Sequence, residues 1–228
     1  YLNPISGRII RDGLGVAMNV MSGDDEIHQI SPLGLIHLTT CTPDFLSLWP
    51  RKEELETILS AIHNHERELL AEPVDMEQER RMKGVLVIKE WINEKSMEEI
   101  ENEWNVQPGD LRGRVDLVEW LLFAMREILS EDEDLRSLQP DGHRELLEAI
   151  SELHRRVRNG CKTDLLGLVT IRGIGRIRAR EMVSLLGVEN ASDVSLLTER
   201  DRSRLADLRG WSPKLVDNIV NEAKRISK

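Results

Sequence analysis

The residues from Asp110 to Ser130 form an uninterrupted stretch in which apolar side chains recur at helical spacing. On a wheel of about 100° per residue, these side chains cover roughly half of the circle. A helix with so wide an apolar face must be embedded in a bundle of other helices. The apolar positions are Val115, Leu117, Val118, Leu121, Leu122, Ala124, Met125, Ile128 and Leu129.

The rest of the chain carries the same helical pattern, and no segment shows sustained alternation of apolar and polar residues. We therefore predict an all-α protein, a multi-helix bundle followed by short helices joined by tight turns. Helices are expected over residues 6–21 (loosened by Gly13 and Gly15), 32–40, 51–70 as one long helix opened by Pro50, 75–94, 96–105, 110–130, 142–158, 164–171, 176–186, 191–198, 199–208 and 214–226. Residues 130–142 are expected to form an acidic, polar connection.

Charge is distributed unevenly along the chain, whose net charge is −10. Residues 161–228 hold 13 Lys and Arg against 9 Asp and Glu, whereas residues 1–160 hold 18 against 32. This shift predicts two domains with different roles, 1–160 and 161–228. The chain also starts without Met, at Tyr1, which suggests a piece of a longer protein.

The segment "RGIGRIRAREM" concentrates positive charge at a turn between two expected helices. Gly173 and Gly175 are expected to adopt backbone angles closed to other residues, which would make the turn tight and bare. The following helix would begin with free N–H groups, which together with the helix dipole attract phosphate. Arg176, Arg178 and Arg180 would add attraction to a polyanion without reading its bases. The alternative is a tight helix–helix corner whose arginines are merely solvated.

A second turn, "LRGWSPKLVDNIV", is typical of a partner hairpin. Gly210 retains one glycine, Ser212 can cap the next helix, and Pro213 suits its first position. Lys214 supplies one positive charge for a phosphate. A purely structural hairpin explains this segment equally well.

The polar face of the Asp110–Ser130 helix carries two aromatic residues, Trp120 and Phe123, on the side opposite to its core. Gly113 lies two turns before Trp120 at nearly the same angle around the helix axis. It leaves space there, next to Arg112. An aromatic ring in such a place can stack on an unpaired base of any sequence. It can equally pack against another part of this chain or of a longer one, and the pattern alone does not separate the two interpretations.

Other candidates for chemistry are weaker. Cys41 and Cys161 lack metal or disulfide spacing and are expected to be reduced thiols, in keeping with a cytoplasmic, nucleoid-associated protein. His63 and His65 diverge on a helix and make a poor metal pair, and Trp91 and Trp104 are expected in the core. No phosphate-binding loop motif and no membrane-length apolar run occur. We thus expect no catalytic site, metal or cofactor in this chain.

Three segments together resemble the C-terminal region of the archaeal HELQ-type superfamily 2 DNA helicases. They are "YLNPISG", "NVQPGDLRGRVDLVEWLLFAMREI" and "LLGLVTIRGIGRIRAR", and the resemblance covers nearly the whole chain. It implies a helical ratchet domain and a small helix-hairpin-helix domain that follow two motor domains and a winged helix, with residues 1–7 leaving the latter. It implies a parent that uses ATP and Mg to unwind DNA 3′ to 5′ at replication forks and in repair.

The resemblance also assigns roles to residues. Trp120 matches the family's base-stacking tryptophan on a helix that crosses the strand's path. The Arg176, Arg178 and Arg180 cluster would touch the emerging strand and restrain the motor. The family's strand-contacting arginine, two turns before the tryptophan, is replaced here by Gly113, which leaves Arg112 or Arg114 to make that contact.

The leading hypothesis is therefore a region that guides single-stranded or forked DNA without sequence preference and works with the parent's other domains. The alternative is an acidic helical scaffold, binding a partner such as a replication protein, in which the hairpins are only structural. A repair glycosylase is a third hypothesis, and Asp193 is the only Asp at a plausible distance beyond the hairpin for its catalytic acid.

Overall fold

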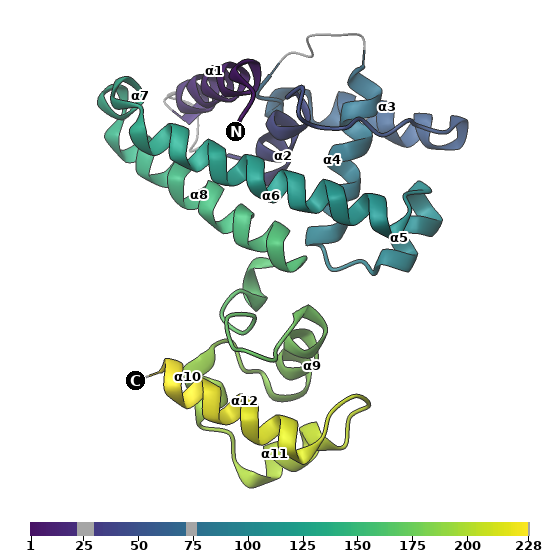
Figure 1. Cartoon of the computed structure of the whole chain (residues 1–228), viewed down its shortest axis with the longest axis vertical. Helices are drawn as coiled ribbons and strands as arrows, with labels where there is room; N and C mark the ends of the chain where they lie inside the picture. The colour runs from purple at the N-terminus through teal and green to yellow at the C-terminus, as the bar shows by residue number, and fades with distance from the viewer. Residues whose placement is uncertain (22–29, 72–76, 228) are drawn as a thin grey trace. The chain divides into compact units, whose positions relative to one another are not determined.

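The structure is a computed structural model that describes residues 1–21, 30–71 and 77–227. These ranges contain helices, turns and no strand, so the all-α prediction is confirmed (Figure 1). The chain divides into two compact units, residues 1–158 and 159–228. Within the described ranges, no helix is both long and apolar enough to cross a membrane.

The first unit is a helical bundle arranged around α4 (Gln78–Ile92). Its other elements are α1 (Pro4–Met21), α2 (Pro32–Thr40), η1 (Lys52–Glu54), α3 (Leu55–Asn64), η2 (Glu66–Glu68), α5 (Met97–Trp104), α6 (Pro108–Glu131), α7 (Glu133–Leu138) and α8 (Pro140–Asn159). Helix α4 packs against α2, α3, α5 and α6 and is buried over most of its length. Trp91 and Trp104 lie in this core, as expected from their amphipathic surroundings.

Glycines in this unit serve packing. Gly13 does not loosen α1, because the helix continues through it and the side chain of Leu38 occupies the place of a β-carbon. Gly84 in α4 likewise lies against the ring of Phe45, at 2.8 Å from where a β-carbon would be. Helix propensity marks such residues as weak points of a helix, whereas the structure uses them for close helix contacts.

Several expected boundaries were wrong. Residues 51–70 do not form one long helix, because they are divided into η1, α3 and η2. Helix α6 begins at Pro108, with Gln107 as its N-cap, so Asp110 lies inside the helix. The acidic residues 130–142 are not a mere connection, because Asp132 caps α7 through Leu135 N and accepts a hydrogen bond from Arg11 of α1 at 2.6 Å. The start of the helix expected over 75–94 lies outside the described residues.

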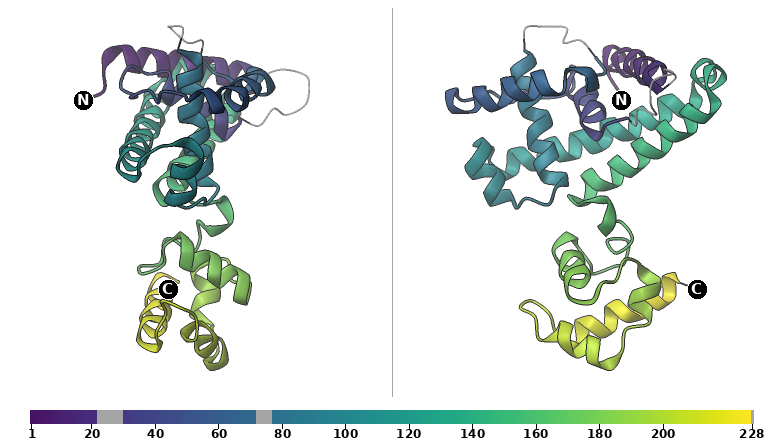
Figure 2. Two further views of the ribbon diagram at one scale, coloured as in Figure 1. Left: turned by 90° about the vertical axis from the view of Figure 1, so that its right-hand side faces the viewer. Right: turned by 180° about the vertical axis from the view of Figure 1, so that it is seen from behind.

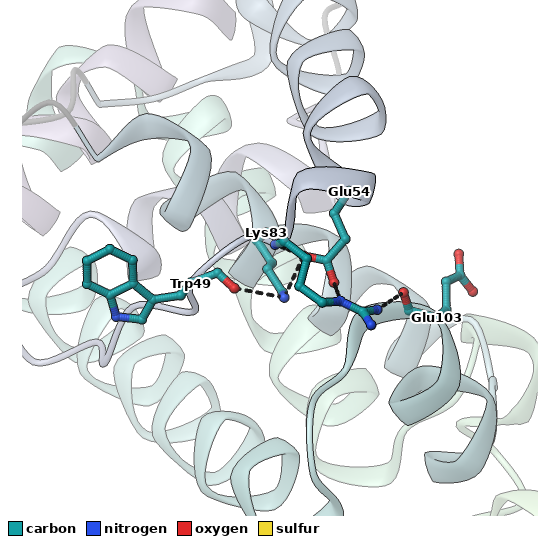
Figure 3. A network of polar contacts seen from close by, with 5 residues as sticks. Trp49, Glu54, Lys83 and Glu103 are labelled. Carbon is teal, nitrogen blue, oxygen red and sulfur yellow. Dashed lines mark hydrogen bonds and ion pairs between the residues drawn. The ribbon is translucent and has the colours of Figure 1, made fainter.

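A buried ion pair fixes the loop between α2 and α3 (Figure 3). Lys83 donates to the Glu54 carboxylate at 2.7 Å and to the carbonyl of Trp49 at 3.0 Å. Burial raises the pKa of Glu54, but hydrogen bonds from Lys83 and Arg51 outweigh it and hold the pKa below its ordinary value. Arg51 also donates to the carbonyl of Glu103, so α4, α5 and η1 hold the loop together. The Trp49 side chain itself is exposed.

The second unit has its own apolar core. It consists of η3 (Thr163–Leu165), α9 (Arg176–Leu186), α10 (Ala191–Ser195), α11 (Glu199–Ala206) and α12 (Pro213–Ile226). Residues 164–171 do not form the expected α-helix, because only the short η3 and successive turns occupy them. Helix α12 packs against α10 and α11.

Candidate nucleic-acid interface

Helix α6 presents two aromatic rings to solvent although its other side is sealed in the core. Leu121 and Leu122 are fully buried, whereas Trp120 is 36 % exposed and Phe123 is 44 % exposed. The helical period separates these adjacent residues, since neighbours on a helix point about 100° apart. The Arg126 guanidinium lies 5.2 Å from the centre of the Phe123 ring. The helical wheel placed both aromatics on the exposed side, and the structure has them there.

Helix α8 returns alongside α6 in the opposite direction (Figures 1 and 2). His143 near the start of α8 contacts the carbonyl of Leu129 at 2.8 Å. Towards the other end, Glu119 lies 3.7 Å from both His154 and Arg158. Burial lowers the pKa of His154, against the raising effect of Glu119, so the positive charge here comes from arginine. No signal in the sequence pointed to Arg158, because the partner helix of α6 could not be identified from periodicity.

The two arginines beside Gly113 differ in their surroundings. Arg114 is paired with Asp110 at 3.1 Å, its side chain is only 16 % exposed, and its Nε is buried with no partner in the described part of the chain. Arg112 is exposed. No described side chain or backbone atom from elsewhere approaches within 4 Å of the place where a Gly113 β-carbon would stand. Arg112 is therefore the better placed of the two to contact a ligand on this face.

The charges around Trp120 nearly balance. Acidic residues Asp116, Glu119 and Glu127 share the face with Arg112, Arg126 and Arg158. Exposed charges in water attract weakly and are screened by salt. A polyanion would therefore gain little from charge on α6.

In the second unit, the first turn has an unusual backbone at only one of its two glycines. Gly173 has φ of +96°, in the region that other residues rarely adopt. Gly175 has φ of −94° and ψ of 174°, an extended conformation open to any residue, so the expectation for Gly175 was wrong. Gly175 is the N-cap of α9, and it makes no side-chain cap hydrogen bond. Because glycine has no side chain, the N-cap residue itself supplies no acceptor to the start of α9.

The second turn repeats the first at an offset of 37 residues along the sequence. Gly210 has φ of +84°, and Trp211 N donates to Leu208 O just as Ile174 N donates to Ile171 O. The repeats differ at the cap, because Ser212 accepts a hydrogen bond from Leu215 N and satisfies one of the donors of α12. Lys214 is exposed in the first turn of α12. The cap residue of the second turn therefore supplies a side-chain acceptor, whereas that of the first turn supplies none.

The three arginines of α9 contact their own unit in different ways. Arg176 donates to the carbonyl of Gly160 at 3.0 Å. Arg180 forms a two-pronged pair with Asp164 at 2.7 and 2.9 Å, and this pairing lowers the pKa of Asp164. Arg178 donates to the carbonyl of Gly173 at 3.0 Å. The three side chains therefore do not form one cluster directed at solvent.

A groove of about 430 Å³ lies between the two turns, lined by Gly175, Arg176, Ile177, Arg178, Glu181, Arg209, Gly210 and Trp211. Arg178 spans the groove, because its Nη2 lies 3.4 Å from the carbonyl oxygen of Gly210. Trp211 Nε1 donates to Glu181 at 2.7 Å, which joins the second turn to α9.

Two further arginines stand at matching places in the repeat. Arg172 precedes Gly173, Arg209 precedes Gly210, and both are exposed. Neither arginine was predicted as a contact residue, although the 37-residue repeat carries the signal.

The remaining candidates show local structural roles. Asp193 accepts a hydrogen bond from Glu189 N, and its own N–H donates to the cap residue Asn190, which is the arrangement of a helix start. Within the described ranges, no group of three or more His, Cys, Asp or Glu is placed to hold a metal ion.

The comparisons with known proteins concern both units. The family described as "Archaeal helicase, domain 4" matches residues 33–160. Three proteins named ATP-dependent DNA helicase Hel308 align over almost the full chain. The one from Methanocella arvoryzae is 31 % identical over 99 % of the chain, that from Pyrococcus horikoshii 27 % over 99 %, and that from Thermococcus kodakarensis 28 % over 96 %. The chain spans 29 % of the length of the first two relatives and 18 % of the third.

Proposed function

The chain belongs to the archaeal helicase domain 4 family, and from that premise we propose that it is the strand-guiding, C-terminal region of an ATP-dependent 3′–5′ DNA helicase. In this proposal, α6 holds single-stranded DNA by stacking, and the second unit holds the phosphate backbone. The parent protein acts at replication forks and in repair. Its motor domains, which lie outside this chain, bind the ATP and Mg.

The observation that carries the proposal is the exposed aromatic pair on α6. Trp120 and Phe123 remain accessible on a helix whose other side is packed in the core. Exposing two aromatic rings forfeits burial energy of about 25 cal/mol per Å². Base stacking recovers such surface and is indifferent to sequence, because every base has a flat face. A strand can then pass across the helix without any base being preferred.

The second unit supports the same function through a different force. Gly175 leaves the start of α9 uncapped by a side chain, and α9 has the length needed for its dipole to act at that end. Arg172 and Arg209 flank the two turns and are exposed. Contacts of these kinds recognise phosphates rather than bases.

The test is a fluorescence-anisotropy titration of the chain with a labelled thymidine 20-mer at several salt concentrations. Two to four phosphate contacts predict a log–log slope of affinity on salt of about −1.4 to −2.8. Unlabelled strands of other sequence should compete within a few-fold of each other. No binding at low salt, or affinity that ignores salt, would contradict the proposal and favour the alternative of an acidic protein-binding scaffold.

A further inference from the structure

Three neighbouring hollows lie on the first unit, lined by residues of or next to α2, α3, α4 and α8, the helices that Figure 1 labels. The first hollow, of about 380 Å³, lies between the start of α2 and the middle of α8. The second, of about 200 Å³, shares Pro32 and Arg156 with the first. The third, of about 430 Å³, between α3 and α4, shares His65 and Lys89 with the second. Neighbouring hollows share lining residues, so the three adjoin one another, and the first of them is called the trough below.

The floor of the trough is apolar at the α8 end. Leu35 and Leu153 line it and are 1 % and 2 % exposed, so their side chains are already fixed by the core. Ile30 and Ala149 line it from either side and are only half-buried. An apolar side chain seated there would cover these half-buried surfaces and would gain the corresponding burial energy.

The rim at this end is acidic. Glu145, Glu148 and Glu152 line the trough from α8. Their spacing of three and four residues places them on one side of the helix. Neither Glu145 nor Glu148 forms an ion pair with any described residue, whereas Glu152 and Arg156, next along the trough, have contacts of their own. Residues 1–158 as a whole hold 18 Lys and Arg against 32 Asp and Glu.

We propose that this trough binds a basic, amphipathic segment of another protein. Its apolar side chains would lie on Ile30 and Ala149, above the buried Leu35 and Leu153, and its Lys or Arg side chains would reach the Glu145–Glu148–Glu152 stripe. An amphipathic helix laid in a groove makes contacts of this kind, with apolar anchors on one face and charges on the other. Complementary charge speeds the encounter and excludes wrong partners, and a nucleic acid would set its phosphates against carboxylates. The inference is independent of DNA binding by α6 and the second unit.

The test uses two labelled peptides of about 18 residues with identical composition. In the first, Leu recurs at positions three and four apart on a Lys-rich helix, which forms one apolar stripe. In the second, the same residues are scrambled so that no stripe exists. Fluorescence anisotropy with the full chain should show at least tenfold tighter binding of the first peptide. Equal binding of the two peptides would overturn the proposal, because a diffuse acidic field would then suffice.

Variants locate the site. The triple variant Glu145→Gln, Glu148→Gln and Glu152→Gln should weaken binding of the amphipathic peptide at least tenfold. Ala149→Phe should do the same, because it fills the groove without changing charge. The matched control replaces three exposed acids away from the trough, Glu53, Glu98 and Glu131, by Gln. Circular dichroism establishes that each variant is folded. An equal loss in the control triple, or displacement of the peptide by a thymidine 20-mer, would refute the assignment.

Discussion

Replacing Trp120 tests the stacking role most directly, because the ring is divided between the core and solvent. The residue is 36 % exposed, and the rest of its surface packs against its own unit. Trp120→Ala removes both parts. Trp120→Leu retains an apolar side chain for packing but has no flat face for a base. A loss of DNA affinity shared by both variants therefore reports on stacking rather than on the fold.

The expected loss follows from the exposed area. A tryptophan of about 250 Å² that is 36 % exposed offers about 90 Å² to a base, which at about 25 cal/mol per Å² is worth about 2 kcal/mol. This lies within the range of about 1–3 kcal/mol found for stacking of a base on an aromatic side chain. Since about 1.4 kcal/mol is a factor of ten, both variants should bind single-stranded DNA about 30-fold more weakly.

The assay is the anisotropy titration with a thymidine 20-mer, with thermal unfolding followed in parallel. The matched control is Trp49→Ala, because Trp49 is 70 % exposed in the same unit but lies on the loop between α2 and α3. Its removal should leave DNA affinity within about twofold of the parent. Stacking releases no counterions, so the Trp120 variants should keep the salt dependence of the parent chain.

Three results would contradict the stacking role of Trp120. Affinity of Trp120→Leu equal to that of the parent would mean that the exposed ring does not meet a base. Equal losses in the Trp49 and Trp120 variants would mean that any exposed indole on this unit binds DNA weakly, so that α6 has no special place. A fall in salt dependence would show that the substitution disturbed phosphate contacts instead.

Two further predictions concern the arginines and a buried histidine. The double variant Arg172→Gln and Arg209→Gln should reduce the log–log slope of single-strand affinity on salt by about 1.4, because each lost phosphate contact removes about 0.7. The control, Arg8→Gln with Arg67→Gln in the first unit, should leave that slope unchanged. Burial, with the nearby charge of Arg81, lowers the pKa of His37 to about 4 from an ordinary 6.5. The free energy of unfolding is therefore highest above about pH 6.5 and falls by about 3 kcal/mol as the pH falls towards 4. Urea titrations should show this fall in the parent chain and a much smaller one in His37→Gln.

The exposed aromatics of α6 could be predicted from the sequence because the helical period alone decides which side chains share a face. The capped starts of α2 and α5 were also foreseeable, since Ser31 and Ser96 are local signals that act within three residues. The two positive-φ turns follow similarly from Gly173 and Gly210. In each case the determining interactions lie within about one helical turn of the chain.

Properties that depend on distant partners could not be predicted. The acidic residues 130–142 were expected to be a solvated connection because nothing local indicates that Arg11 meets Asp132. The arginines of α9 were expected to form one basic cluster, although Arg180 is committed to Asp164 and Arg176 to the carbonyl of Gly160. A sequence defines the charge of a side chain but not its direction, because long side chains choose among nearby partners once the fold brings these together.

The two units would hold a strand by forces that respond to different conditions, and this division suits a strand that must move. Charges around Trp120 nearly balance, so under the proposed function binding of the strand to α6 would depend on stacking and would resist salt. The second unit has an excess of positive charge and a glycine N-cap on α9, so under the proposed function it would bind phosphates, with an affinity that weakens with salt. Bases present equivalent faces and phosphates repeat uniformly, so each one-nucleotide shift restores the same contacts. A holder of this kind imposes no sequence-dependent pause, whereas one hydrogen-bonded contact to a base edge, worth about 1–3 kcal/mol, would slow movement at each matching base.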